Sequence, residues 1–129
     1  MSPELIREWI VKAEEDYAVL EVLSHQRKRR VFDSICFHAQ QCAEKYLKAL
    51  LTSHQIVPPR THNVKALAEF LQPKEPTIEL IKDLLNRLTP YAVETRYPGE
   101  FATAREAKAA YAAAKEIRRF ARARLKLSR

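Results

Sequence analysis

The sequence predicts an all-α fold, an up-and-down antiparallel bundle of four long helices and one short helix. Three observations support this prediction. Apolar residues recur every three or four positions over most of the chain, which is the spacing of one face of a helix. No segment alternates apolar and polar residues in the manner of a half-buried strand. The chain also has one glycine in 129 residues, which leaves almost no tight hairpin turns.

The first predicted helix is long and amphipathic. Ser2 is expected to act as its N-cap, with Pro3 at the first helical position, where a missing backbone N–H leaves no bond unmade. Its apolar residues keep helical spacing until about His25. Residues 26–30 then form a short basic connector to the next helix.

The second and third predicted helices are separated by a pair of prolines. Asp33 is expected to cap the second helix, which extends to about Ser53. Pro58–Pro59 then prevents a helix. Thr61 is expected to cap a short third helix that ends at Gln72–Pro73, because the residue before a proline disfavours helical geometry.

The last two predicted helices are marked by threonines. Thr77 begins the fourth, which Pro90 is expected to kink or interrupt. The segment Thr103–Glu106 has the form of a capping box and begins the last helix, whose many alanines allow a neighbouring helix to approach closely. Alternating helix directions would bring the connector 27–30 and the loop 96–99 to one end of the bundle, with the C-terminal arginines at the other.

The composition describes one soluble domain, residues 1–129. With 47% hydrophobic and 30% charged residues the chain is neither disordered nor disulfide-built, and no apolar stretch resembles a membrane span or a signal peptide. Cys36 and Cys42 point in different directions on one helix, so we expect reduced thiols and a cytoplasmic location. No histidines have metal-ligand spacing and one glycine cannot form a phosphate-binding loop, so no metal and no cofactor are expected.

The net charge of +7 raises the alternative of a passive nucleic-acid binder. Much of the excess comes from two groups of cations, the connector 27–30 and the set Lys115, Arg118, Arg119, Arg122, Arg124, Lys126 and Arg129. The second group lies in the last turns of a predicted helix, where cations favour the negative end of the helix dipole. Because the two groups fall at opposite ends of the bundle, they form no continuous patch, and this alternative is less favoured.

The segment from Phe37 to Leu51 has two faces of opposite character when it is drawn as a helix. One face is apolar and belongs to the core. The other carries the polar residues His38, Gln41, Glu44, Lys45 and Lys48. Solvent does not favour Phe37 and Leu51 at the margin of this polar face, so we expect a second subunit or a ligand to cover it. A merely solvated face with a Glu44–Lys48 ion pair is the alternative.

Four segments of the chain form a pattern that is found together in one known family. They are Ala13–Ala18, Phe37–Leu51, Thr61–Asn63 with Leu67, and Thr95–Pro98. On these segments the chain resembles the HEPN domain, the small helical partner of minimal nucleotidyltransferases in bacteria and archaea. The resemblance implies a helical bundle that forms a homodimer, binds a minimal nucleotidyltransferase and belongs to a toxin–antitoxin type system.

Many HEPN domains are metal-independent ribonucleases, and this chain departs from their motif. The motif is an arginine followed, after about four to six residues, by a histidine. The arginine stabilises the charge of the phosphorane, and the histidine moves the proton of the ribose hydroxyl. The last histidine of this chain is His62, so the motif is absent near the last helix. We therefore expect binding rather than catalysis. The alternative is a ribonuclease with a displaced site, either His38 with Arg30 or His62 with Arg60.

These considerations define a candidate site on the second helix and on the loop before the last one. The expected nucleotide or partner site comprises His38, Gln41, Glu44, Lys45, Lys48, Arg96 and Tyr97. The expected dimer contacts are Phe37 and Leu51. Arg96 and Tyr97 are expected to reach an anion or an aromatic group of the partner.

Overall fold

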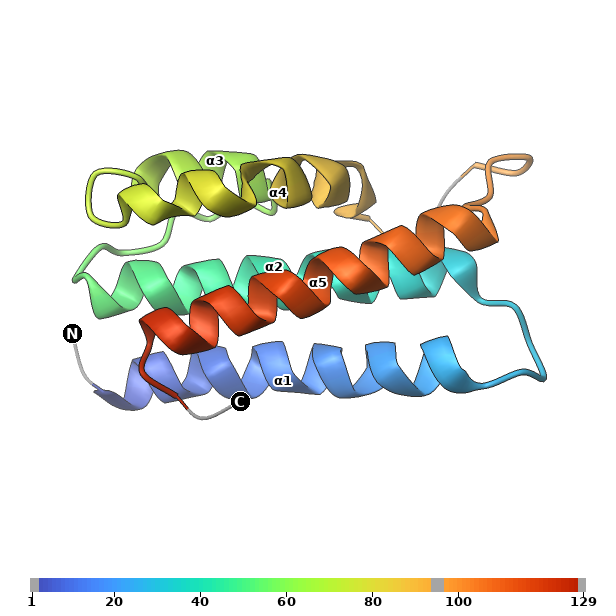
Figure 1. The fold of residues 1–129 in the computed structure, drawn as a ribbon, viewed down its shortest axis with the longest axis horizontal. Helices are drawn as coiled ribbons and strands as arrows, with labels where there is room; N and C mark the ends of the chain where they lie inside the picture. The colour runs from blue at the N-terminus through green and yellow to red at the C-terminus, as the bar shows by residue number, and fades with distance from the viewer. Residues whose placement is uncertain (1–2, 94–96, 128–129) are drawn as a thin grey trace.

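The computed structural model of the chain describes residues 3–93 and 97–127. The helices are α1 (Pro3–His25), α2 (Phe32–Ser53), α3 (Val64–Leu71), α4 (Lys82–Leu88) and α5 (Ala104–Arg124), and two 3₁₀ segments, η1 (Pro76–Ile81) and η2 (Thr89–Tyr91), flank α4. Helix α2 runs in the opposite direction to α1, and α5 in the opposite direction to the segment of η1, α4 and η2, as Figure 1 shows. The described residues contain no strand, and the predicted all-α bundle is confirmed. Within the same residues, none of the helices combines the length and apolar character needed to traverse a lipid bilayer.

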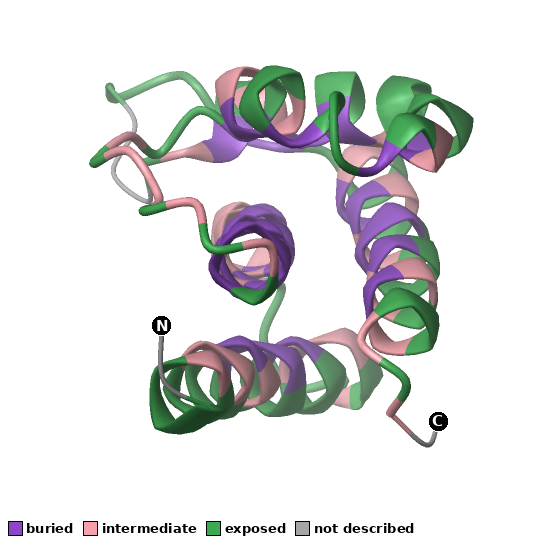
Figure 2. Cartoon of the chain, turned by 90° about the vertical axis from the view of Figure 1, so that its left-hand side faces the viewer, coloured by how far each residue is buried: buried purple, intermediate pink, exposed green. Residues whose placement is uncertain are grey.

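Helix α2 lies at the centre of the bundle. Figure 2, a view along the long axis, shows α2 with α1 on one side, α5 on a second and the layer of α3 and α4 on a third. Large side chains of α2 are therefore completely buried, among them Tyr46, Leu47, Leu50 and Leu51. The fourth side of α2, between α1 and the segment that precedes α3, carries no helix.

The start of α2 differs from the prediction that Asp33 caps it. The helix begins at Phe32, and Asp33 lies inside the first turn. Its Oδ1 atom accepts a hydrogen bond of 2.8 Å from the backbone N–H of Ala102. This bond joins the start of α2 to the segment before α5, so the connector after α1 and the loop before α5 lie at the same end of the bundle, as predicted (Figure 1).

Of the other predicted caps, Thr61 is wrong and the capping box of Thr103 and Glu106 is confirmed, while Ser2 lies outside the described residues. Helix α3 is capped by Asn63, whose side chain accepts from the backbone N–H of Ala66. Thr61 lies two residues too early for this role, and its hydroxyl instead accepts from the backbone N–H of Asn63 at 3.1 Å. Helix α5 begins with the predicted capping box, in which Thr103 and Glu106 each accept from the other's backbone N–H.

The fourth predicted helix is divided into three successive segments. Residues 76–91 form η1, then α4, then η2. Pro90 lies in η2, where its missing N–H and its ring prevent α4 from continuing, so the predicted interruption is confirmed. The apolar residues Ile78, Ile81, Leu85 and Leu88 of this segment nevertheless all lie in the core.

Candidate functional site

The polar residues of α2 are held from α1 by a single carboxylate. Asp16 is buried, and its two oxygens contact His38 and Lys45. The Nδ1 atom of His38 lies 2.8 Å from Oδ1 of Asp16, and Lys45 donates to Oδ2. Burial acts to raise the pKa of Asp16, but the hydrogen bonds from His38 and Lys45 outweigh it, and the pKa is lowered. Two of the predicted site residues are thus tied to an ionised aspartate.

A second buried carboxylate, Glu44, holds two further polar side chains, those of Lys48 and His62. Its side chain is 3% exposed. Lys48 donates to it at 3.0 Å, and the Nδ1 atom of His62 lies 3.1 Å away. The imidazole of His62 is 72% exposed. Glu44 therefore orients a histidine that faces solvent.

Gln40 connects α2 to the segment before α3. It is completely buried, donates to the backbone carbonyl of His62 at 2.6 Å and accepts from Gln41 at 2.8 Å. The sequence assigned no role to Gln40 or to Asp16. The available signal for Asp16 was its position on the apolar stripe of α1, three residues after Ala13, where a carboxylate needs a partner.

Three of the predicted site residues are not on the surface. Glu44 and Lys48 are buried and paired with each other, and Lys48 also lies 5.4 Å from the ring centroid of Trp9. Leu51, expected at a dimer interface, is 0% exposed and belongs to the core, so no second subunit is needed to cover it. The physical reason is the central place of α2, which leaves little of its circumference in contact with solvent.

The part of α2 that stays accessible is small and mixed in character. We call it the open face: Phe37, His38, Gln41 and Lys45 of α2, with His62 beside them. All four α2 residues are half-buried, and Phe37 packs edge-on against the His38 ring, with centroids 5.3 Å apart. Tyr97 is 81% exposed in the loop before α5. Arg96, the remaining predicted residue, lies outside the described residues.

The described residues provide no sign of thiol or metal chemistry. Cys36 and Cys42 are buried, and burial raises the pKa of the Cys42 thiol, which disfavours the nucleophilic thiolate. Among the residues that the structure describes, no group of three or more His, Cys, Asp or Glu side chains is arranged to hold a metal ion.

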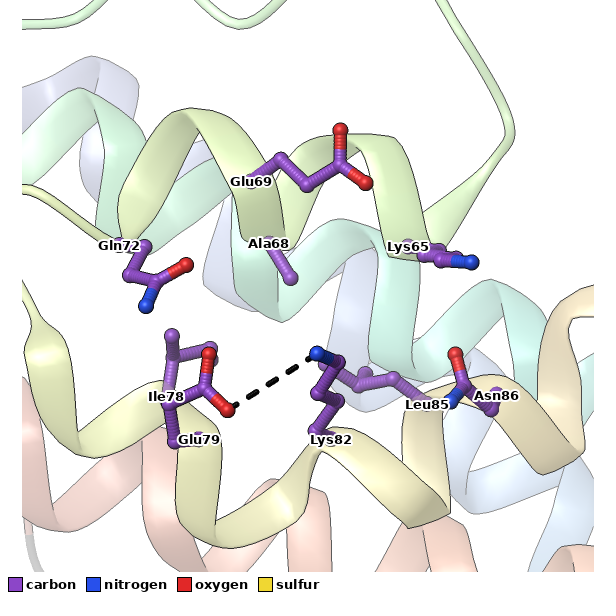
Figure 3. Close-up of a pocket in the computed structure, with 9 residues that line it drawn as sticks. All are labelled: Lys65, Ala68, Glu69, Gln72, Ile78, Glu79, Lys82, Leu85 and Asn86. Atoms are coloured by element: carbon purple, nitrogen blue, oxygen red, sulfur yellow. Dashed lines mark ion pairs between the residues drawn. The ribbon is translucent and has the colours of Figure 1, made fainter.

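A small cavity lies between α3 and the segment of η1 and α4 (Figure 3). Its volume is about 70 Å³, and Lys65, Glu69 and Ile78 are among the residues that line it. Glu79 and Lys82 form an ion pair of 4.0 Å at its edge. Sites for small organic ligands occupy roughly 300–1,000 Å³, so this cavity is too small for a nucleotide.

A comparison with protein-family models gives a match to the model described as the HEPN domain, over residues 6–124. No curated protein and no solved structure matches the chain. The matched span covers most of the chain, from the first turn of α1 to the last residue of α5. It contains the open face of α2 and both carboxylates that hold its side chains.

Proposed function

Because the chain belongs to the HEPN domain family, we propose that it is a binding module: a homodimer that associates with a minimal nucleotidyltransferase in a toxin–antitoxin type system. The open face of α2 is the proposed contact surface. The observation that carries this proposal is that Asp16 and Glu44 hold the side chains of this face in place from inside the chain. Side chains that are already ordered lose little conformational entropy when a partner binds.

The chemistry of the open face also favours a protein partner. His38, Gln41 and Lys45 have partners within the chain and are still partly exposed, and the aromatic ring of Phe37 lies beside His38. A partly exposed aromatic anchor among polar groups is typical of protein interfaces. Nucleotide binding by the predicted polar residues of α2 has less support, because Glu44 and Lys48 are buried and paired with each other.

The test of this proposal is co-purification with the product of a neighbouring nucleotidyltransferase gene, combined with the mass of the purified chain in solution. We expect a dimer that retains the partner. Phe37→Arg should weaken the complex by about tenfold or more, since it places a charge at the proposed anchor. Val22→Arg, at a side chain that is 66% exposed on α1, is the matched control and should leave binding unchanged.

Two outcomes would contradict the proposal. One is a monomer that fails to retain the nucleotidyltransferase. The other is a complex that tolerates Phe37→Arg as well as it tolerates Val22→Arg, provided that both variants unfold at the same denaturant concentration as the parent chain.

A metal-independent ribonuclease is the second candidate, and the geometry of His62 favours it. Glu44 holds Nδ1 of the ring, and the exposed side chain leaves Nε2 free to accept a proton from a ribose hydroxyl. Arg60 is exposed two residues earlier. The alternative pair has less support, because the His38 side chain is 22% exposed against 72% for His62, and Arg30 lies before the start of α2.

The ribonuclease hypothesis predicts cleavage of RNA by the purified chain in the presence of a metal chelator. His62→Ala should reduce the rate by about 10²–10⁴, the usual contribution of a general acid or base. His25→Ala is the control, because His25 is exposed on α1, where its ring hydrogen-bonds to the backbone of its own helix and packs edge-on against Tyr111. Equal cleavage by both variants would exclude His62 as the catalytic group.

A further inference from the structure

A cavity lies between the last turn of α1 and the first turns of α2 and α5, at the right-hand end of Figure 1. All three helices contribute residues to its lining. Its volume is about 320 Å³, which is within the range of small-molecule sites. An apolar cavity of about 150 Å³ already holds a molecule of benzene, so this one has room for a larger apolar body.

The walls of this cavity are mainly apolar and aromatic. Ile35 of α2 and Ala107 of α5 line it and are buried. The rings of Phe32 and Tyr111, which are partly buried, complete these walls. The Tyr111 ring is also held from outside, because His25 packs edge-on against it with centroids 5.8 Å apart. Walls of this kind favour a hydrocarbon chain or an aromatic ring as the occupant.

The lining includes one hydroxyl group whose hydrogen bonds are not satisfied. The Oγ atom of Ser24, in the last turn of α1, is buried and has no hydrogen-bond partner in the described part of the chain. Buried polar groups are nearly always bonded, because a hydroxyl that leaves water without a new partner is destabilising. A ligand that carries an oxygen atom would supply this partner.

The charge at the mouth of the cavity is positive. Lys108 is the one charged residue among the described lining residues, and it is exposed to solvent. It forms no ion pair with another described residue. The first turn of α5 also lines the cavity, and the positive end of a helix dipole favours an anion. A single lining cation balances an anion with a single charge.

The surroundings of the cavity have the same character. Phe32 also lines a second cavity of about 240 Å³, together with Arg30 and the exposed Phe101. Arg30 ends the basic connector 27–30, all of which is exposed. Positive charge and apolar surface therefore continue beyond the mouth, and both would attract an anion with an apolar body.

We propose that this cavity binds a small carboxylate with an apolar body, either an aliphatic chain or an aromatic ring. The body would lie against Phe32, Ile35 and Tyr111, with the carboxylate on the ammonium group of Lys108. The hydroxyl of Ser24 would donate to an oxygen of the ligand. The cavity shares no residue with the open face of α2, so this proposal does not depend on the nucleotidyltransferase partner.

The test is calorimetric titration of the purified chain with octanoate, 3-phenylpropionate, octylamine and acetate. We expect one or both of the first two to bind. Octylamine has the wrong charge and acetate lacks the apolar body, so neither should bind. Lys108→Gln should weaken carboxylate binding by about tenfold to a hundredfold, the scale of a hydrogen bond to a charged group. Arg105→Gln, three residues earlier at an exposed position outside the lining, is the matched control and should leave binding unchanged.

Two further variants test the hydroxyl group and the shape of the cavity. Ser24→Ala should weaken carboxylate binding by about twofold to tenfold. It should not lower the melting temperature of the free chain, because no described hydrogen bond is lost. Ala104→Phe, at an exposed position of the lining, should abolish binding by filling the mouth, and a thermal melt checks that this variant is folded.

The comparison of the two carboxylates identifies the apolar body. Tighter binding of octanoate indicates an aliphatic chain, and tighter binding of 3-phenylpropionate indicates an aromatic ring. The proposal is overturned if neither binds, if octylamine binds as tightly as they do, or if the Lys108 variant binds as well as the Arg105 variant. It is also overturned if Ala104→Phe lowers the mass of the protein in solution, because the cavity would then be an interface with a second copy of the chain.

Discussion

Leu51→Ala is expected to lower the free energy of unfolding by about 2–5 kcal/mol, the range for removing a large aliphatic side chain from a packed core. Leu51 is 0% exposed and belongs to the central core cluster. Helix α2 is enclosed on three sides (Figure 2), so its neighbours cannot all relax into the space that the substitution leaves. If Leu51 lay at a dimer interface, Leu51→Ala would instead change the mass of the protein in solution.

The measurement is urea unfolding of the parent chain and of the Leu51→Ala variant, each at several protein concentrations. Val57→Ala is the control, because Val57 is an aliphatic residue close in sequence but 76% exposed, and its truncation should change stability by less than about 0.5 kcal/mol. A Leu51→Ala variant with unchanged stability but weaker self-association would restore Leu51 to the interface and contradict its placement in the core.

Glu14→Ala is expected to lower the free energy of unfolding by about 1–3 kcal/mol. Glu14 is the shared acceptor of Arg118 and of the buried Tyr46 hydroxyl, and Arg122 lies close by. Removing it leaves two neighbouring guanidinium groups without their carboxylate, and a half-buried cluster that loses one partner is destabilised by the groups left behind. Glu15→Ala, at the next position and exposed to solvent, is the control in the same urea experiment.

The pH dependence of the Glu14→Ala effect follows from the pKa of the carboxyl group. Hydrogen bonds from Arg118 lower the pKa of Glu14, burial acts in the opposite direction, and the bond from Tyr46 lowers it further. A lowered pKa in the folded state means that the stabilisation is complete above the unfolded pKa of about 4.3 and is lost as the pH falls through the lower folded value. The difference between parent and variant should therefore be full near neutral pH and shrink below about pH 4. A difference that is constant down to strong acid would show that packing, not charge, is responsible.

Local sequence signals placed the long helices well. The apolar spacing and the end signals located α1 to His25 and α2 to Ser53. Thr103 and Glu106 marked the start of α5, because a capping box involves only residues within one turn. The four short segments that resemble the HEPN domain agree with the family match over residues 6–124.

The caps and the interface residues were less predictable for a common reason. Asp33 has a suitable side chain for a cap, but a backbone N–H from residue 102 takes its oxygen. Leu51 was placed at the margin of a polar face because a helical wheel shows directions and not the number of neighbouring helices. Since α2 is surrounded on three sides, that margin lies inside the core.

The sequence by itself determined the all-helical class, the long helices and the family. These depend on contacts between residues three or four positions apart, which periodicity records. Only the tertiary structure decided that Asp16 holds His38 across 22 positions, and that Glu14 holds Arg118 across 104. Such pairs depend on which helix faces meet, and that choice is made by the packing of the whole core around α2.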